Sequence, residues 1–447
     1  MEDSLFIVRA SLSFLVVGLL MIWGWRVLKW LWLKPKKLEK FLRQQGYTGN
    51  PYRFLSGDIK EILAMTRQAR SKPMSSITDD IAPYVIPHYH QTVKNYGKNL
   101  IRWFGPSPRV TITDPELIRE IFTKFNEFRK PRVNPLLMLL FSGLLTLEGD
   151  EWAKHRKIIS HAFHQDKLKS LYIPGWRFLP TKTNRKLKAM DKDIKDSLRE
   201  LVKKREDAVK AGQVNNDDLL GILVESNFKE IQEHGDHKSM GMSIEDVVDE
   251  CKMFYLAGQE TTSVLLVWTM FLLARYPNWQ TKAREEVLQV FGDGKPDPDD
   301  LSHLKVVTMI LNEVLRLYPP IVLLGRSLSK DMKLGKLSLL AGVVVSIPTL
   351  LIHHDPEIWG EGALEFRPER FAEGVSKATK SQGTFLPFGG GTRICIGLNF
   401  ALMEAKMALA MILRRFWFEL SPSYAHSPIT VITLRPQHGA HIILHKL

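Results

Sequence analysis

Residues 388–397 have the sequence Phe-Gly-Gly-Gly-Thr-Arg-Ile-Cys-Ile-Gly, and an apolar run with helical spacing over 398–416 follows directly. Three consecutive glycines permit positive φ and let the backbone approach a flat, bulky group closely. Cys395 precedes the expected helix and lies two residues after Arg393, and both features favour the thiolate over the thiol. A soft thiolate on a tight loop suits an iron or copper ion. A lone cysteine is otherwise a small buried apolar side chain, but the glycines and Arg393 favour the metal ligand.

The longest helical pattern lies upstream of this loop, between residues 243 and 275. Ser243 can cap it together with Asp246, and Pro277 follows its end. About 33 residues form a rod of ~50 Å, long enough to cross a whole domain. Residues 264–273 are apolar on nearly every side, which predicts that this half of the helix is buried.

The rest of the body shows mostly helical patterns with a small β region. Residues 100–104 and 109–112 flank a Gly-Pro-Ser-Pro turn and predict two strands. Residues 183–213 carry apolar side chains at helical spacing among many charges, which predicts an exposed amphipathic helix. The pattern therefore predicts a mainly α fold with a minor β region and a long central helix.

Residues 5–25 form a 21-residue apolar stretch whose only charge is Arg9. This length spans a hydrocarbon core of ~30 Å. The start lacks the basic region and the small-residue cleavage site of a signal peptide, and the lysines that follow predict a cytosolic body. The alternative is a buried helix of a soluble protein. We expect a membrane anchor over 1–33, a basic linker over 34–51 and a cytosolic catalytic domain over 52–447.

Composition excludes several classes of protein. The chain has 447 residues, 45% hydrophobic and 25% charged, which is the ordinary globular balance. Its 62 Lys and Arg exceed its 48 Asp and Glu, for a net charge of +14. Two cysteines exclude a disulfide framework and a zinc site of several thiolates. No basic–aromatic patch suggests nucleic acid.

The run from Phe388 to Gly397 resembles Phe-x-x-Gly-x-Arg-x-Cys-x-Gly, the haem-ligand signature of the cytochromes P-450, which are haem-thiolate monooxygenases. The resemblance implies haem b with Cys395 as axial thiolate ligand, and it places Phe388 and Gly397 against the cofactor. It also implies O2 and a hydrophobic small molecule as substrates. NADPH–cytochrome P-450 reductase would be the electron donor, and the endoplasmic reticulum membrane the location.

Glu313 and Arg316 lie three residues apart, on one face of an expected helix. On spacing alone they are a solvated surface pair. Glu313 lies 82 residues before Cys395. By resemblance, the two residues match the buried Glu/Arg pair of the family, which Arg370 completes.

Residues 257–262 are Ala-Gly-Gln-Glu-Thr-Thr, and a glycine with two threonines weakens a helix. The resemblance implies that the central helix opens locally here. Glu260 and Thr261 then match the acid–alcohol pair that delivers protons during oxygen activation. The alternative is that the threonines bond back to helix carbonyls.

Trp152 and Arg156 share one helix face and can converge on one anionic group. The resemblance makes that group a haem propionate, and Arg326 and Arg393 match further propionate-binding positions. The loop over 130–149 and several mostly apolar residues are candidates for the pocket wall, which suggests an apolar substrate. These residues are Phe254, Ala257, Ile321, Val322 and Leu324. We interpret the His353-His354 pair as structural.

Residues 42–52, 171–179 and 435–447 resemble the plant branch that contains secologanin synthase, whose members oxidise terpenoids and related hydrophobic acids. One interval departs from the family. Only 105 residues separate Arg156 from Thr261, whereas the family places there the helices lettered D to G and the start of the central helix. Four helices of ~11–12 residues with linkers barely fit that length.

We therefore expect that helices D, E and most of F are missing, with an internal deletion at 170/171. Because helix E packs on the central helix in the family, we expect residues 264–273 to lose cover. Two rival hypotheses remain. One is a truncated, catalytically inactive membrane protein, and the other is an isomerase or dehydratase on the same fold, against which the Glu260–Thr261 pair argues.

Overall fold

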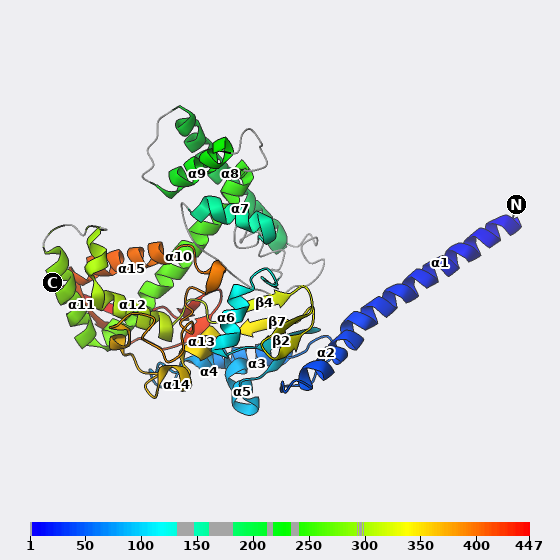
Figure 1. The fold of residues 1–447 in the computed structure, drawn as a ribbon, viewed down its shortest axis with the longest axis horizontal. Helices are drawn as coiled ribbons and strands as arrows, with labels where there is room; N and C mark the ends of the chain where they lie inside the picture. The colour runs from blue at the N-terminus through cyan, green and yellow to red at the C-terminus, as the bar shows by residue number, and fades with distance from the viewer. Residues whose placement is uncertain are drawn as a thin grey trace.

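The computed structural model describes residues 2–131, 147–160, 182–211, 218–233, 241–292, 294, 297 and 299–447, with only the backbone at a few of these positions, residues 156–160 among them. One long helix, α1, extends from a body built around α10, and α7, α8 and α9 lie together at one end of α10 (Figure 1). The helices are α1 (Glu2–Leu28), α2 (Lys34–Arg43), α3 (Ile59–Arg70), α4 (Ala82–Val85), α5 (Pro87–Tyr96), α6 (Pro115–Thr123), α7 (Gly149–Ser160), α8 (Lys182–Lys210), α9 (Leu219–Glu233), α10 (Ile244–Arg275), α11 (Pro277–Phe291), α12 (Lys305–Leu317), α13 (Thr349–His353), α14 (Pro356–Trp359) and α15 (Leu398–Leu413).

The β region is small, as predicted. The largest sheet has the order β1-β2-β7-β4-β3, in which β2 and β7 are parallel and the other pairs antiparallel. The remaining strands form two-stranded sheets. The strands are β1 (Ile101–Phe104), β2 (Ser107–Thr111), β3 (Phe128–Arg129), β4 (Leu324–Leu328), β5 (Met332–Leu334), β6 (Leu337–Leu339), β7 (Val344–Ile347), β8 (Phe416–Leu420), β9 (Pro428–Thr430), β10 (Leu434–Pro436) and β11 (Ile442–Lys446). The predicted fold class is confirmed.

The central helix α10 begins at the predicted cap. The Asp246 amide donates to Ser243 Oγ at 3.2 Å, and the Ser243 amide donates to the Asp246 carboxylate at 2.9 Å. The helix is continuous from residue 244 to residue 275, so the expected local opening over 257–262 is not present. Thr261 Oγ1 instead donates to Ala257 O at 2.7 Å. This is the alternative in which a threonine bonds back to a carbonyl of its own helix.

The second half of α10 is the centre of the hydrophobic core. Residues 264, 265, 268 and 271–273 are all at most 6% exposed. Trp268 stacks on Tyr318 with ring centroids 4.3 Å apart, and its Nε1 donates to Leu434 O at 2.8 Å. The expectation that residues 264–273 lose cover is therefore wrong. Their cover comes from α12, α15, β8 and β10, which follow α10 in the sequence.

The N-terminal rod is packed against the body at its base. A π-helical turn (Lys29–Leu33) joins α1 to α2, and Leu38 and Leu42 of α2 are buried. Tyr52 Oη donates to Leu31 O at 2.6 Å, and the Tyr52 ring contacts Trp103. Residues 34–43 of the expected linker therefore form a helix, α2, whose apolar face packs against the body.

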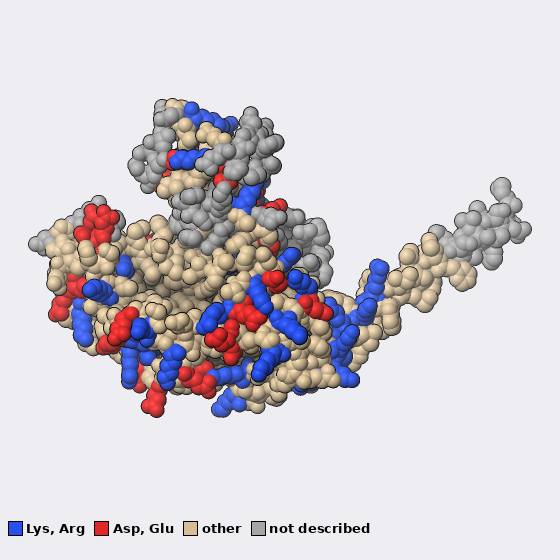
Figure 2. All heavy atoms as spheres, viewed as in Figure 1, with Lys and Arg blue, Asp and Glu red and all other residues tan. Residues whose placement is uncertain are grey.

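In the part of the chain that the structure describes, two helical stretches are long and apolar enough to cross a membrane, residues 13–43 and α10 itself. The second is the core helix just described. The first extends away from the body, and Lys and Arg side chains gather at its base (Figure 2).

Candidate functional site

The loop before α15 folds into a tight turn around Cys395. The Cys395 amide donates to Phe388 O at 2.8 Å, and the Ile394 amide donates to Gly391 O at 3.0 Å. These bonds hold Cys395 directly ahead of α15, and it is only 4% exposed. A cysteine that sits at a helix N-terminus experiences the positive end of the helix dipole, which favours its thiolate form.

The glycines of this loop are needed for close packing on α6. Gly391 has φ +66°, and a Cβ there would lie 2.5 Å from Phe122 O. At Gly390 a Cβ would lie 3.0 Å from the Phe122 ring. The sequence predicts that these glycines admit a flat group. At Gly390 and Gly391, however, the neighbour is Phe122 at the end of α6.

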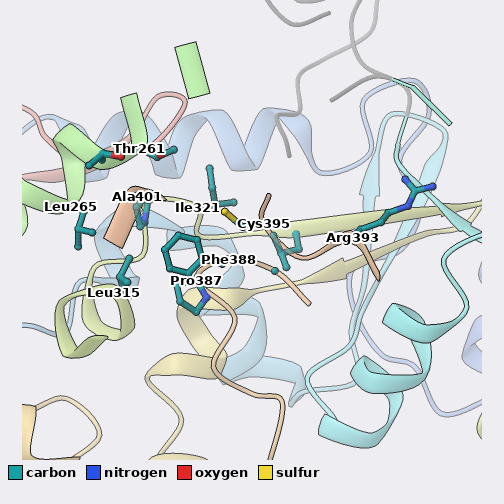
Figure 3. A pocket seen from close by; sticks show the side chains of 13 residues that line it. Thr261, Leu265, Leu315, Ile321, Pro387, Phe388, Arg393, Cys395 and Ala401 are labelled. Atoms are coloured by element: carbon teal, nitrogen blue, oxygen red, sulfur yellow. The ribbon is translucent and has the colours of Figure 1, made fainter. Parts of the chain in front are cut away.

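Cys395 lines a mostly apolar cavity between its loop and α10 (Figure 3). Its volume is about 40 Å³. Cys395 and Thr261 both line this space, from the loop and from α10. Its other walls are Thr262, Leu265, Leu315, Pro320, Ile321, Leu324, Pro387, Phe388, Gly389, Arg393 and Ala401. An apolar cavity with few polar groups is typical of a binding site for a hydrophobic molecule.

The predicted acid–alcohol pair is divided between two environments. Thr261 lines the cavity. Glu260 is not among the lining residues, and its Oε1 accepts a hydrogen bond from Thr433 Oγ1 at 2.7 Å. Thr433 precedes β10, and its contact with Glu260 could not be predicted because 173 residues separate the two.

Arg393 is held by a carboxylate that the sequence did not indicate. Its Nη1 and Nη2 donate to the two oxygens of Glu148 at 2.7 and 2.6 Å. The guanidinium also lies over the ring of Trp152, 4.7 Å from its centroid. Burial raises the pKa of Glu148, but the bonds from Arg393 and the Lys130 amide, together with the charges of these two residues, hold that pKa below its usual value. In Figure 3 the Arg393 side chain extends away from Cys395.

The surroundings of Arg393 fit a group that carries carboxylates. Arg393 Nε is buried and has no hydrogen-bond partner among the described residues, so the guanidinium retains a donor. Arg326 is buried in β4, with its guanidinium 5.5 Å from the Phe122 ring centroid. The structure brings the Arg393 guanidinium over the Trp152 ring, and Arg326 lies over Phe122 at the end of α6. Arg156 lies in α7, but its side chain is outside the described residues. A thiolate candidate, an apolar cavity and buried arginines together fit a thiolate-ligated haem with its two carboxylates.

The buried ion pair expected from the resemblance is formed. Glu313 and Arg316 are both 0% exposed, and Arg316 Nε and Nη2 donate to the Glu313 carboxylate at 2.8 Å each. Arg316 Nη1 donates to His353 O at 2.7 Å. Arg370 Nε lies 3.6 Å from Glu313 Oε1. The surface-pair alternative is wrong, because α12 buries this face against the chain around α13 and residue 363.

His353 connects this ion pair to the cysteine loop. Its Nδ1 lies 3.2 Å from Arg316 O, and its Nε2 accepts from the Leu386 amide at 2.9 Å. Burial and the nearby Arg316 lower the pKa of His353 well below its ordinary value and that of His354 to about 3. Both histidines are neutral and bonded to backbone, which agrees with their structural interpretation.

The remaining predicted pocket residues are distributed unevenly. Ile321 and Leu324 line the cavity, and Val322 is buried just behind them. Phe254 and Ala257 pack on the cluster between α7, α8 and α10, and they are not among the lining residues. Residues 132–146 of the predicted pocket loop and the 170/171 position lie outside the described residues.

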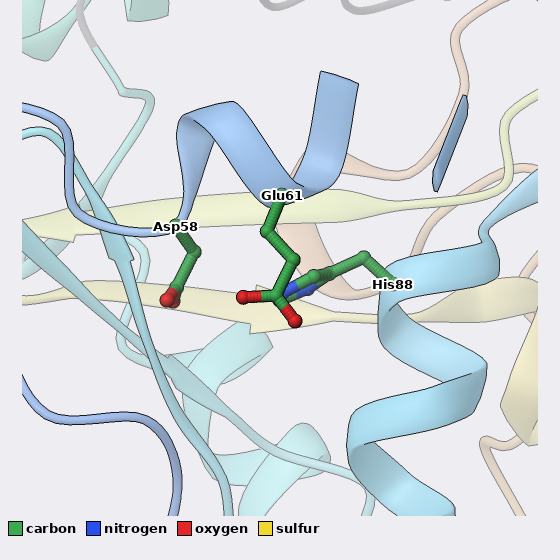
Figure 4. A group of neighbouring side chains, drawn as sticks. All are labelled: Asp58, Glu61 and His88. Atoms are coloured by element: carbon green, nitrogen blue, oxygen red, sulfur yellow. The ribbon is translucent and has the colours of Figure 1, made fainter. Parts of the chain in front are cut away.

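A second polar cluster, Asp58, Glu61 and His88, offers three metal-type ligand atoms within 4.8 Å of one another (Figure 4). Arg102 Nη1 lies 3.3 Å from His88 Nδ1, which must therefore accept. The neutral ring then carries its proton on Nε2, which leaves no ring nitrogen for a metal. Asp58 already accepts the Trp103 amide at 2.7 Å. We interpret the cluster as a structural network.

Comparison with known proteins agrees with this geometry. The chain matches the family model described as cytochrome P450 over residues 85–175 and 170–442. It is 48% identical to 7-deoxyloganic acid hydroxylase of Catharanthus roseus, with 98% of this chain and 99% of that protein covered. It is 44% identical to secologanin synthase 1 of Catharanthus roseus, with both chains fully covered, and 47% identical to cytochrome P450 CYP72A219 of Panax ginseng, with 97% and 98% covered. The chain therefore belongs to the cytochrome P450 family, a family of haem-thiolate monooxygenases.

Proposed function

We propose that this monooxygenase inserts one oxygen atom of O2 into a C–H bond of a hydrophobic plant metabolite, a terpenoid or a related compound. The observation that carries the proposal is the buried Cys395, which shares an apolar cavity with Thr261 of α10. The names of two relatives, 7-deoxyloganic acid hydroxylase and secologanin synthase 1, support a terpenoid-type substrate.

Haem b would be held by Cys395 through iron and by Arg393, Arg326, Trp152 and Arg156 through its carboxylates. When bound, it supplies the iron at which dioxygen is activated, and thiolate ligation favours cleavage of the O–O bond. The bonds that the Cys395 and Ile394 amides donate to Phe388 O and Gly391 O fix the position of the cysteine backbone. The apolar walls exclude water and bind the hydrocarbon part of the substrate.

Thr261 and Glu260 would control proton supply. The Thr261 hydroxyl is bonded to Ala257 O, yet as an acceptor it can still receive a proton at the cavity wall. Glu260 is fixed by Thr433 at 2.7 Å. When protonated, the Glu260 carboxyl can pass its proton to the Thr261 hydroxyl through a small side-chain rotation or a water, and the resulting carboxylate then takes up a proton from solvent.

The location that we propose is the endoplasmic reticulum membrane, with the catalytic domain in the cytosol and a single N-terminal span. The apolar helix over residues 13–43 supports the span. Trp30 and Trp32 are exposed near its base, where tryptophan favours the headgroup region. The basic side chains around that base support the cytosolic orientation (Figure 2). Electrons would come from NADPH–cytochrome P-450 reductase.

Turnover with purified reductase tests this proposal. The chain and the reductase are combined in lipid vesicles with NADPH and a panel of terpenoids, terpenoid acids and size-matched fatty acids. We expect oxygenated product from the terpenoid group, dependent on both NADPH and reductase, with one oxygen atom from 18O2. Product formed without reductase would contradict an oxygenase and favour the isomerase or dehydratase alternative.

A second candidate function, an inactive truncated membrane protein, is supported by chain length. The alignment with secologanin synthase 1 has 523 positions and covers all 447 residues of this chain, so about 76 positions face no residue of it. The two family-model matches meet between residues 170 and 175, near the proposed deletion. Three missing helices with their connections correspond to roughly 70 residues. If this candidate is right, turnover appears only after such a segment is inserted at 170/171.

A further inference from the structure

The turn between β9 and β10 is fixed against α10 and the cavity wall by the backbone around Thr433. The Leu434 amide donates to Pro320 O at 3.0 Å, and Leu434 O accepts from Trp268 Nε1 at 2.8 Å. The Val431 amide donates to Thr433 O at 3.3 Å. Pro320 lines the cavity, and Trp268 belongs to the core half of α10. Thr433 is therefore held by the same elements that shape the site.

The Thr433 hydroxyl has a single acceptor among the described residues. Thr433 is 1% exposed, so its hydroxyl is shielded from solvent. Its Oγ1 donates to Glu260 Oε1 at 2.7 Å and makes no other hydrogen bond in the described part of the chain. A buried donor that is left without an acceptor destabilises the folded state. The Thr433 hydroxyl therefore donates to Glu260 whether the carboxyl group is ionised or protonated.

This bond decides which oxygen of Glu260 carries the proton. In a protonated carboxyl group one oxygen bears the O–H donor, and the carbonyl oxygen is the better acceptor. Because Oε1 accepts from Thr433, Oε1 is the carbonyl oxygen of the protonated group and the proton resides on Oε2. Oε2 forms no hydrogen bond with the described residues. Glu260 is only partly buried, so water can reach its carboxyl group.

We propose that Thr433 is a positioning residue for proton supply, because its hydroxyl holds Oε1 of Glu260 and leaves Oε2 as the oxygen that takes up and releases the proton. This inference rests on the proposed roles of Glu260 and Thr261. In the step, the Oε2–H bond breaks while an O–H bond forms at the Thr261 hydroxyl or at a water between them. The Thr261 hydroxyl releases its own proton into the cavity, and Oε2 then takes a proton from solvent.

The bond also restricts the motion of the carboxyl group. A proton donor acts efficiently only when it is held within reach of its acceptor. Without the Thr433 hydroxyl, the carboxyl group rotates and the proton is shared between Oε1 and Oε2. Protons then reach the cavity less selectively, although no group that holds the cofactor has changed.

Infrared spectroscopy tests the assignment on the 447-residue chain without requiring haem or turnover. Spectra are recorded along a pH titration, and the carboxyl C=O band that Glu260→Gln lacks is assigned to protonated Glu260. A carbonyl group that accepts a hydrogen bond absorbs at a lower wavenumber than a free one. We expect Thr433→Val to move this band to higher wavenumber, and Thr433→Ser, which retains a hydroxyl, to leave it near its original position.

Turnover in the reconstituted system then separates positioning from folding. We expect Thr433→Val to retain the thiolate-type carbon monoxide band, to lower product per NADPH several-fold and to increase the solvent isotope effect of D2O on product formation. Thr433→Ser is expected to restore all three quantities. In the Glu260→Gln background, Thr433→Val is expected to have no further effect, because the acid that it positions is already absent.

Thr92→Val is the matched control for the loss of a buried hydroxyl. Thr92 is 4% exposed, and its Oγ1 donates to His88 O at 2.7 Å within α5. The substitution removes the same atoms as Thr433→Val but touches neither α10 nor the cavity. It is expected to change neither the Glu260 band nor the product formed per NADPH.

Three results overturn the proposal. The first is an unchanged Glu260 band in Thr433→Val, which would contradict the hydrogen bond itself. The second is an equal loss of coupling from Thr433→Val with and without Glu260→Gln, because the effect would then not depend on the acid. The third is a shifted band in Thr433→Val together with unchanged coupling in Glu260→Gln. That result would place the failure in the proposed role of Glu260, whereas the first two leave that role intact.

Discussion

Arg393 and Glu148 form a two-bonded ion pair, at 2.7 and 2.6 Å, two residues before the buried Cys395. The pair joins the cysteine loop to the start of α7, because Glu148 directly precedes that helix and its Oε1 also accepts the Lys130 amide at 2.9 Å. Glu148 takes two of the five N–H donors of Arg393, and the buried Nε has no partner among the described residues, so it is available to a cofactor carboxylate. Glu148 thereby fixes the direction of that remaining donor, which makes it a positioning residue.

Glu148→Gln is expected to release haem several-fold faster, because the buried guanidinium loses its counter-charge and one of its two fixed bonds. The rate is measured as haem transfer to apomyoglobin. Glu116→Gln, which removes a carboxylate from an exposed pair on α6, is the matched control and is expected to change nothing. Slower release from Glu148→Gln would show instead that Glu148 competes with the cofactor carboxylates.

Thr261→Ala is expected to retain haem binding, because the substitution touches none of the residues that hold the cofactor. Product per NADPH falls and hydrogen peroxide release rises, since the cavity loses the hydroxyl that directs protons. Both quantities are measured in the reconstituted system. Thr269→Ala is the matched control, because the Thr269 hydroxyl makes the same bond back to its helix, to Leu265 O at 2.8 Å, and Thr269 is not among the residues that line the cavity. Unchanged coupling in Thr261→Ala would remove this residue from proton delivery.

Arg316→Leu is expected to lower the free energy of unfolding by about 3–5 kcal/mol, the cost of leaving one buried partner without its counter-charge. Arg119→Leu is a matched control, because Arg119 and Glu116 form an exposed pair at the same i,i+3 spacing on α6. Such a surface pair contributes at most ~1 kcal/mol. Urea unfolding in detergent, followed by tryptophan fluorescence, measures both. Equal effects of the two substitutions would contradict a structural role for the buried pair.

Stability is expected to fall as the pH decreases from about 6.5 toward 4. Burial lowers the pKa of His354 to about 3 and that of His426 to about 4, so the unfolded chain binds more protons than the folded chain in this range. Each such histidine contributes a slope of about 1.4 kcal/mol per pH unit below its unfolded pKa. Urea midpoints between pH 4 and 8 measure the slope, and His354→Gln should reduce it. A flat profile below pH 6.5 would contradict the buried neutral histidines.

Local motifs allowed much of the site to be predicted from sequence. The Cys395 loop, the Glu313–Arg316 pair and the capped start of α10 depend on residues a few positions apart, and their geometry follows from turn and helix spacing. The Arg393–Glu148 and Glu260–Thr433 contacts join residues 245 and 173 positions apart. No local pattern specifies such partners.

The error about residues 264–273 has a similar cause. A helix that is apolar on every side indicates burial, but it does not indicate which elements provide the cover. The structure buries that segment under α12, α15, β8 and β10. The glycines of the cysteine loop likewise indicate that another group approaches the backbone closely. The sequence does not indicate that this group is Phe122, which the structure places against Gly390 and Gly391.

The most direct test of the central claim, that Cys395 holds haem iron in this cavity, is the reduced carbon monoxide difference spectrum of the full 447-residue chain in lipid vesicles. The account predicts the strongly red-shifted Soret band of a thiolate-ligated haem. Cys395→Ser is expected to lose that band, while Cys251→Ser, which removes the other cysteine, keeps it. A folded 447-residue chain that takes up haem without this band, or a Cys395→Ser chain that retains it, would contradict the claim.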